Sequence, residues 1–233
     1  MSKHVLLTGF EPFGPHKVNP SEMLVKSLEG RLIAGRLIVI RVLPSETRTM
    51  HERLETALHD EQPDLLIGVG LAAGRSSLAL ERLAVNVLDF EMADAVGVQK
   101  KDDMVSRGGP DARIATIPFN EIVDNWKAAG VPGYISNSAG TYLCNQWLYE
   151  ALTLASVAAP PIPVGFLHVP LLPGQAMEAG AEKTSSMALD TMRRGLESMI
   201  ETIVPWIESR PHEKLTKSGP SVWIPRGLRE VER

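Results

Sequence analysis

The amino-acid sequence predicts an α/β protein with a single three-layer α/β/α domain built on a twisted, mostly parallel central sheet. Short apolar runs alternate with amphipathic segments of helical period, which is typical of such domains. The apolar runs are rich in Val, Ile and Leu, as expected of parallel strands buried on both faces. The 233-residue chain is long enough for one large domain. We expect residues 1–204 to form it, and residues 205–233 to form a tail that packs on the domain or on a neighbouring subunit.

The first part of the chain alternates between strands and helices. The pair Asn19-Pro20 opens the first helix, because a capping residue followed by a first-turn proline is a helix-start signal. The loop before this helix presents two aromatic residues, Phe10 and Phe13. The predicted strands are 5–8, 37–43 and 64–70, and the predicted helices are 20–28 and 45–59.

Residues 77–87 fit two kinds of element. Leu78, Leu80 and Leu83 alternate with other residues and the segment is rich in branched side chains, so we interpret it as a strand, with a helix as the alternative. Residues 89–112 are polar and contain several glycines, which predicts a long surface loop. The remaining elements are predicted as strands at 114–117, 133–136 and 162–169, and as helices at 120–129, 144–155 and 177–203.

The ends of the predicted strands carry the residues best suited to chemistry. Phe10 and Phe13 follow the first strand, residues 71–75 follow the third, and Cys144 and His168 lie at or just after later strand ends. In parallel α/β sheets, binding sites gather beyond the carboxyl ends of the strands. These residues are therefore expected to share one site.

Cys144 is the only cysteine in the chain and lies at the start of a predicted helix. The first turn of a helix has free N–H groups and a positive dipole end, which favour a thiolate and can hold an oxyanion. The small and hydroxyl residues at 136–141 suit a tight turn, and we expect one of them to cap the helix. The alternative is that Cys144 is a small buried hydrophobic residue.

A thiol nucleophile needs a base and a third group that orients the base. Of the six histidines, His168 is the strongest candidate, since it lies near the end of an apolar strand; a satisfied core histidine is the alternative. Glu81 lies in a segment that we expect to be partly buried, and a carboxylate there needs a partner. It either pairs with a cation such as Arg82 or orients the histidine.

Composition excludes several classes of function. A net charge of −4 gives no reason to expect nucleic acid or an anionic membrane as a partner. A single cysteine excludes an internal disulfide framework, and no metal-binding spacing is present. The N-terminal apolar run is too short for a signal peptide, and no run reaches membrane-spanning length. A free reactive thiol suits the cytoplasm, where we expect this protein.

Four motifs follow one another between about residues 4 and 203. They are Gly9-Phe10-Glu11-Pro12-Phe13-Gly14 with Asn19-Pro20-Ser21; Gly74-Arg75 with Glu81-Arg82-Leu83-Ala84-Val85-Asn86; Ser136-Asn137-Ser138-Ala139-Gly140-Thr141-Tyr142-Leu143-Cys144-Asn145; and Phe166-Leu167-His168-Val169-Pro170-Leu171-Leu172-Pro173. Together they closely resemble pyroglutamyl peptidase I, the pyrrolidone-carboxylate cysteine peptidase family.

The resemblance implies a triad of Cys144, His168 and Glu81 on a single α/β/α domain. It implies a cysteine exopeptidase that removes N-terminal pyroglutamate (5-oxoproline) from peptides, and we expect a thioester acyl-enzyme. No metal or cofactor is implied, and the partners are peptides with N-terminal pyroglutamate. Family members are often oligomeric, so we expect a homo-oligomer, either a dimer or a tetramer.

The resemblance also implies a pocket for the flat lactam ring. Flat apolar faces with a few placed polar groups suit a neutral cyclic amide. The implied residues are Phe10 and Phe13 on the ring faces, Tyr142 and Leu143 as further wall, Asn19 as support for the aromatic loop, and Leu71 as a backbone hydrogen-bonding partner.

Glu91 departs from the family pattern, because the family places an arginine there, near the reacting carbonyl. A carboxylate at that place would repel an oxyanion and raise the thiol pKa. Two alternatives therefore stand beside the main hypothesis: a triad-bearing relative with altered specificity for N-blocked amides, or a weakly active pyroglutamyl-binding protein. Gln175 is a second departure, since the family often has glutamate there.

Overall fold

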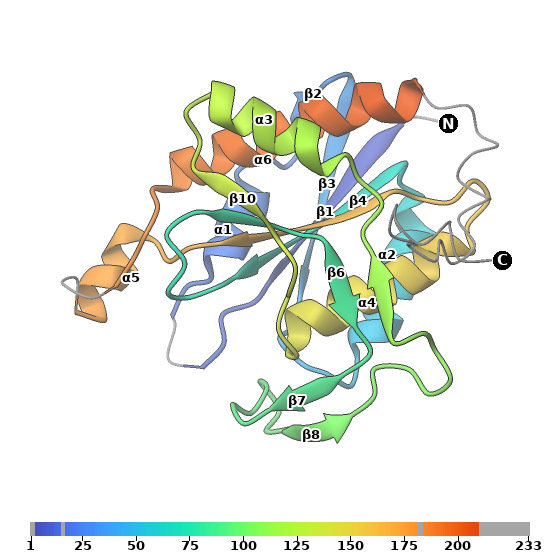
Figure 1. Cartoon of the computed structure of the whole chain (residues 1–233), viewed down its shortest axis with the longest axis vertical. Coiled ribbons are helices and arrows are strands. Elements are labelled where there is room, and N and C mark those ends of the chain that lie inside the picture. Colours follow the sequence, from blue (N-terminus) through green and yellow to red (C-terminus); the bar gives the residue numbers. More distant parts are fainter. Residues whose placement is uncertain (1–2, 15–16, 181–183, 210–233) are drawn as a thin grey trace, which may run out of the picture.

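The central feature is a seven-stranded sheet with helices on both faces (Figure 1). The computed structural model describes residues 3–14, 17–180 and 184–209. The strand order is β10-β5-β11-β4-β1-β3-β2. The strands are β1 (His4–Phe10), β2 (Leu32–Ile33), β3 (Arg36–Leu43), β4 (Leu65–Leu71), β5 (Leu78–Glu81), β10 (Gly133–Ser136) and β11 (Val164–Val169). The three-layer α/β/α prediction is confirmed.

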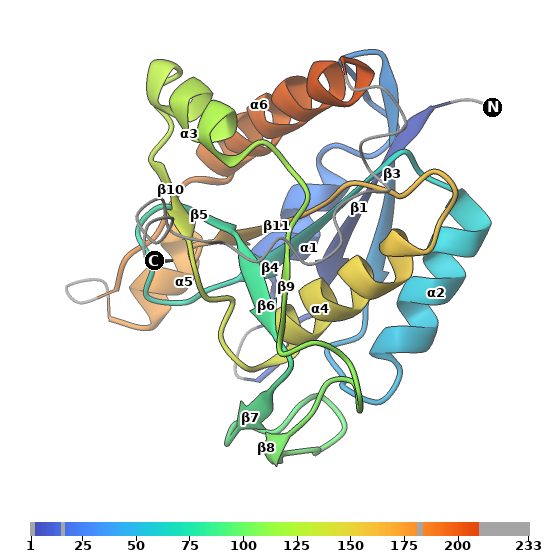
Figure 2. The same cartoon turned by 45° about the vertical axis from the view of Figure 1, so that its right-hand side comes forward.

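The helices form two layers. Helices α1, α3 and α6 cover one face of the sheet, and α2 and α4 cover the other (Figures 1 and 2). The helices are α1 (Pro20–Lys26), α2 (Met50–Glu61), α3 (Phe119–Ala128), α4 (Leu143–Ser156), α5 (Pro173–Glu178) and α6 (Leu189–Glu208). None of the helices in the described part of the chain is long and apolar enough to span a membrane.

Most strand pairs in the sheet are parallel. Strand β1 pairs in parallel with β3 and β4, β4 with β11, and β10 with β5. Antiparallel pairs join β2 to β3 and β11 to β5. Almost every residue of β1, β4 and β11 is buried, which explains why their sequences are apolar throughout. The sheet is therefore mixed but mostly parallel, as predicted.

Two glycines in β4 allow α4 to lie close to the sheet. A Cβ atom at Gly68 would lie 2.6 Å from the ring of Phe166 and 2.7 Å from that of Trp147. A Cβ at Gly70 would lie 2.7 Å from the sulfur of Cys144. Any side chain at either position would push α4 and its N-terminal turn away from β4. The glycines thus set the height of the cysteine above the sheet.

The region from 77 to 114 is more structured than predicted. Residues 77–87 are extended, as β5 and β6 (Leu83–Val85), so the strand prediction is confirmed. The surface-loop prediction for 89–112 is wrong: β7 (Leu88–Phe90) pairs with β8 (Lys100–Asp103), and β9 (Ala112–Ile114) pairs with β6. The sequence Lys-Lys-Asp-Asp of β8 is largely exposed and has no apolar alternation, which explains the error. The hairpin β7–β8 projects from the body of the domain (Figure 2).

Two helix predictions need correction. Residues 45–49 precede α2, because Ser45 Oγ donates to the carbonyl of Glu11 and the Thr47 N–H donates to Asp94. The single helix predicted at 177–203 is two helices. Helix α5 ends before Gly180, whose φ of +91° is not helical, and α6 begins at residue 189.

Helix α6 extends beyond the predicted end of the domain. It continues through Pro205 to Glu208, and Trp206 packs against the hydrophobic core. The proline lies in the last turn, so it removes only one hydrogen bond near the end of the helix. The rest of the expected tail, residues 210–233 with Trp223, lies outside the described residues.

Candidate active site

Cys144 is the second residue of α4, as the sequence predicts. The expected cap is wrong: the N-cap residue is Tyr142, whose side chain makes no capping hydrogen bond. The hydroxyls before it serve the turn instead, since Ser136 Oγ and Ser138 Oγ accept from the N–H groups of Ser138 and Gly140. The N–H groups of the first helical turn therefore face no capping side chain and suit an incoming oxyanion.

Neighbouring strands bring His168 and Glu81 together. Antiparallel pairing of β11 with β5 sets His168 opposite Ala79, so Glu81, two residues after Ala79 on the same face of the sheet, lies diagonally across from His168. The Nδ1 atom of His168 lies 2.7 Å from Oε1 of Glu81, and both side chains are buried. A carboxylate at Nδ1 leaves Nε2 of the imidazole as the basic nitrogen. This is the pairing by which an acid orients a catalytic base.

Cys144 shares one face of the sheet with His168. The register of β4 and β11 makes Gly70 the neighbour of His168, and the sulfur of Cys144 lies over Gly70. The ring of Phe166 lies on the same face, with its centroid 5.0 Å from that of His168. The described residues include no hydrogen bond from the thiol to the imidazole. In enzymes without substrate, such contacts are often long and tighten on binding.

Arg75 contacts the candidate triad, although sequence reasoning gave it no role. Its Nη1 donates to Oε1 of Glu81 at 2.6 Å, and its Nη2 donates to the carbonyl of Ser138 at 3.3 Å. One guanidinium thus joins the carboxylate to the loop that leads into α4. The available signal was its place in the Gly74-Arg75 motif just after a strand end.

The charges of these groups define the resting state. Burial, with a smaller contribution from Glu81, raises the pKa of Cys144 to about 12, although Arg75 opposes this. Burial also lowers the pKa of His168 despite its bond to Glu81. Burial alone would raise the pKa of Glu81, but His168, Ser136 and Arg75 together lower it.

The raised thiol pKa argues against the thiolate that the helix N-terminus was expected to favour, and that expectation stays a prediction. Cys144 is half-buried with its sulfur over Gly70, and burial raises the pKa of the thiol. The resting site combines a neutral thiol, a neutral imidazole and an ionised carboxylate.

The predicted substrate-binding residues come from the end of β1, the loop before α1, the end of β4 and the start of α4. Phe10 ends β1 and is only 4% exposed, and its N–H donates to Ser21 Oγ. Asn19 donates to the carbonyl of Glu11 and accepts from the Ser21 N–H, which fixes the loop that follows Phe10. Leu71 ends β4 beside Val169 of β11.

Three aromatic rings cluster beside the start of α4. Tyr142 lies with its ring centroid 6.2 Å from that of Phe13 and 4.6 Å from that of Phe90. Leu143, the next residue after Tyr142, is almost fully buried. Phe90 had no role in the sequence analysis, because it lies in the segment interpreted as a surface loop. An aromatic wall thus adjoins the thiol, and its role in substrate binding stays a prediction.

Asn145 is a second residue that sequence reasoning missed. Its side chain accepts from the N–H of Val85 and donates to the carbonyls of Val85 and Val87. This buried amide pairs with β6 as a neighbouring strand would, and so fixes α4 next to Cys144. A buried asparagine within an apolar helix was the signal that could have found it.

The two departures from the family pattern have distinct surroundings. Glu91 is exposed, and its backbone carbonyl accepts from the side chain of Gln99. The charges that act on the thiol are those of Glu81 and Arg75. Gln175 is buried; it accepts from the Leu172 N–H and donates to the carbonyl of Val18, a donation that an ionised glutamate lacks.

An α/β domain that holds one cysteine at a helix N-terminus, above a buried His–Glu pair, has the architecture of a thiol-dependent acyl-transfer enzyme. The family model for pyroglutamyl peptidase matches residues 3–205, and the chain belongs to this family of cysteine peptidases.

Known relatives match over nearly their whole length. The chain is 40% identical over 198 residues to the pyrrolidone-carboxylate peptidase of Thermococcus onnurineus, which covers 85% of this chain and 97% of the relative. It is 42% identical to pyrrolidone-carboxylate peptidase 1 of Ralstonia nicotianae, over 92% and 97% of the two chains. The structure of pyroglutamyl peptidase I from Bacillus amyloliquefaciens superposes with a TM-score of 0.82 at 35% identity, covering 88% and 96%.

Proposed function

We propose that Cys144, His168 and Glu81 carry out the reaction of this pyroglutamyl peptidase, the removal of N-terminal pyroglutamate from peptides. The observation that carries the assignment is the buried pair of His168 and Glu81, 2.7 Å apart, on the sheet face that also holds the sulfur of Cys144. The family supports the reaction, and the geometry supports these residues as its catalytic groups.

The first half of the reaction forms a thioester. Nε2 of His168 takes the proton of the Cys144 thiol as the sulfur bonds to the pyroglutamyl carbonyl carbon. The carbonyl oxygen becomes an oxyanion, which the N–H of Cys144 and a neighbouring N–H stabilise. The carbon–nitrogen bond then breaks, and the proton on His168 passes to the leaving amine. Glu81 keeps the imidazole in the correct tautomer and stabilises its positive form.

The second half releases the acid. His168 takes a proton from water while the water oxygen attacks the thioester carbonyl. The carbon–sulfur bond breaks, and the proton returns from His168 to the sulfur. The products are free pyroglutamate, the shortened peptide and the original thiol. The neutral thiol and neutral imidazole of the resting site fit a sequence in which the proton moves only as the substrate reacts.

The aromatic cluster supports recognition of the lactam. Phe13 and Tyr142 offer flat apolar surfaces beside the thiol, and the backbone at Leu71 offers polar groups at the end of β4. A neutral five-membered lactam has matching apolar faces and one amide edge. A substrate with an N-blocked but open-chain end lacks that shape.

The proposal also includes the cellular compartment and the oligomeric state of this protein. The single cysteine is not in a disulfide and must stay reduced to act, which supports the cytoplasm. We also propose a homo-oligomer, a dimer or tetramer, as the resemblance to the family implies. Sedimentation of the reduced protein distinguishes the monomer from these assemblies.

A panel of chromogenic amides tests the function and its alternative. We expect the reduced protein to cleave the pyroglutamyl amide, to cleave N-acetyl and N-formyl amides far more slowly, and to lose all activity after alkylation by iodoacetamide. Preference for an open-chain amide would establish the altered-specificity alternative that Glu91 suggests. Activity that survives complete alkylation of Cys144 would contradict the thiol mechanism.

A further inference from the structure

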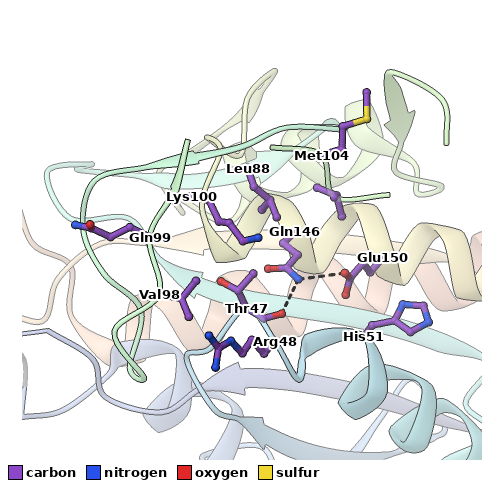
Figure 3. Close-up of a pocket in the computed structure, with 11 residues that line it drawn as sticks. Thr47, Arg48, His51, Leu88, Val98, Gln99, Lys100, Met104, Gln146 and Glu150 are labelled. Carbon is purple, nitrogen blue, oxygen red and sulfur yellow. Dashed lines mark hydrogen bonds between the residues drawn. The ribbon is translucent and has the colours of Figure 1, made fainter. Parts of the chain in front are cut away.

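A pocket separate from the candidate active site lies beside α4. It has a volume of about 500 Å³ and opens between the start of α2, the hairpin β7–β8 and α4 (Figure 3). None of the residues predicted for the active site lines it. Gln146 and Glu150 come from α4, Thr47 and Arg48 from the segment before α2, and Lys100 from β8.

Two buried side chains at the inner end of this pocket have unused acceptor atoms. Gln146 and Glu150 are 4% and 7% exposed. The Nε2 of Gln146 donates to the carbonyl of Thr47 at 2.9 Å and to Oε1 of Glu150 at 3.1 Å, which fixes the orientation of the amide. Within the described part of the chain, Oε1 of Gln146 and Oε2 of Glu150 have no hydrogen-bond partner. Buried acceptors without donors are costly, so this end of the pocket suits a group that donates hydrogen bonds.

The carboxylate also lacks a compensating charge. Burial raises the pKa of Glu150 to about 7, and the amide of Gln146 only partly opposes this. The basic residues of the pocket do not relieve the burial: Arg48 and His51 are exposed at the rim, and Lys100 pairs with Asp103 at 2.7 Å. A glutamine at 150 would avoid the cost of a buried charge. A glutamate at this position therefore indicates that a bound ligand supplies a positively charged hydrogen-bond donor.

The residues at the mouth and along the walls of the pocket indicate which class of ligand it would bind. Arg48 is exposed at the mouth of the pocket, where its guanidinium would repel a simple cation but attract a carboxylate. Leu88, Val98, Met104 and Val105 add an apolar wall. We propose that this pocket binds a small zwitterion, an α-amino acid or dipeptide with an apolar side chain. Its ammonium group lies at Gln146 and Glu150, and its carboxylate lies toward Arg48.

Titration followed by methyl NMR tests this site directly. The probe is L-leucine, added to the full-length protein with labelled Leu and Val methyl groups. We expect saturable shifts at Leu88, Val98 and Val105, with little change at Leu71 and Leu143 beside the thiol. No saturable shift at the pocket methyls up to about 10 mM leucine, or shifts confined to Leu71 and Leu143, would overturn the proposal.

Two analogues separate the zwitterion from other ligands. L-leucine amide lacks the carboxylate, and 4-methylpentanoate lacks the ammonium group. Each is expected to bind at least about tenfold more weakly than L-leucine, because one end of the pocket is left unmatched. Equal binding of all three compounds would show that only the apolar wall contributes and would overturn the assignment.

Matched variants locate the two ends. Glu150→Gln is expected to weaken leucine binding by about tenfold or more, whereas the exposed control Glu55→Gln leaves it unchanged. The rim variant Arg48→Gln is expected to weaken leucine but not leucine amide, and its exposed position leaves the fold intact. Unchanged leucine affinity in either pocket variant would contradict the proposed orientation.

Discussion

Arg75 links the acid of the proposed triad to the loop in front of the nucleophile. It donates to both Glu81 and the carbonyl of Ser138, and it is the cation that acts on the Cys144 thiol. It also lowers the pKa of His168 through its charge. At the scale of single residues, we therefore propose Arg75 as a positioning residue that acts through the proposed triad.

Replacing this arginine gives a prediction with a defined sign. In Arg75→Gln the His168 pKa rises, because a nearby positive charge is removed. The base must be neutral to accept the thiol proton, so the acid limb of the profile of kcat/KM against pH moves to higher pH. We expect kcat to fall by about tenfold or more, with partial rescue in Arg75→Lys. An unshifted acid limb in the glutamine variant would show that Arg75 serves only the fold.

Glu150 gives a prediction about stability. Its folded pKa is raised from 4.5 to about 7, so the folded protein binds this proton more tightly than the unfolded chain. Its contribution to stability is therefore present below about pH 4.5 and is lost as pH rises to about 7.

The variant Glu150→Gln removes that dependence. Relative to the natural protein, its free energy of unfolding is expected to gain about 1–3 kcal/mol between about pH 4.5 and pH 8. Urea unfolding at the two pH values measures the difference, and Glu55→Gln is the exposed control. A constant difference between variant and natural protein at both pH values would show that Glu150 is not the buried, proton-binding group described.

The sequence identifies some of these residues and not others. Cys144 and His168 could be selected because each is the reactive residue type at a predicted strand or helix end. Glu81 could be selected because it is an acid in an apolar segment. The raised pKa of the thiol could not be predicted, since it depends on how Cys144 packs over Gly70. The bridging role of Arg75 depends on a contact across 63 positions of the chain.

At the scale of elements, the closeness of α4 to β4 controls the position of the nucleophile. Gly70 has no side chain, and an added Cβ would lie 2.7 Å from the sulfur and 2.9 Å from the ring of Phe166. Gly70→Ala is therefore expected to shift the thiol and reduce kcat/KM by about a hundredfold or more, because small displacements of reacting groups are costly.

A glycine in open space gives the matched control. A Cβ at Gly174 in α5 would have no atom within 4 Å, so Gly174→Ala is expected to leave kcat/KM unchanged. Circular dichroism checks that both variants are folded. Natural turnover in a folded Gly70→Ala protein would show that the sulfur is not held by this contact.

Elements with strong apolar patterns could be predicted, and those without could not. The almost wholly buried strands β1, β4 and β11 have largely apolar sequences, and the predicted positions agree. Strand β8 is charged and exposed, so its pairing with β7 leaves no signal in the pattern. The break between α5 and α6 was hidden because residues on both sides suit a helix, and the bridge from Leu171 to Ser186 that separates them is a long-range contact.

At the scale of the whole molecule, the sheet order brings distant segments to one edge. Strands β1, β4 and β11 are parallel neighbours, so Phe10, Leu71 and His168 meet at their carboxyl ends. This gathering could be predicted from the fold class alone. The antiparallel pairing of β5 with β11, which brings Glu81 near His168, could not be predicted. No local pattern distinguishes parallel from antiparallel pairing in a short buried strand.

The most direct test of the catalytic assignment is to trap the acyl-enzyme. Reduced protein is mixed with a pyroglutamyl amide, quenched in acid within one turnover and analysed by peptide mass spectrometry. We expect the peptide that contains Cys144 to gain the mass of one pyroglutamyl group, and we expect Cys144→Ser to lose both this thioester and nearly all turnover. Product release without any adduct on Cys144, or near-normal turnover in Cys144→Ser, would contradict Cys144 as the nucleophile.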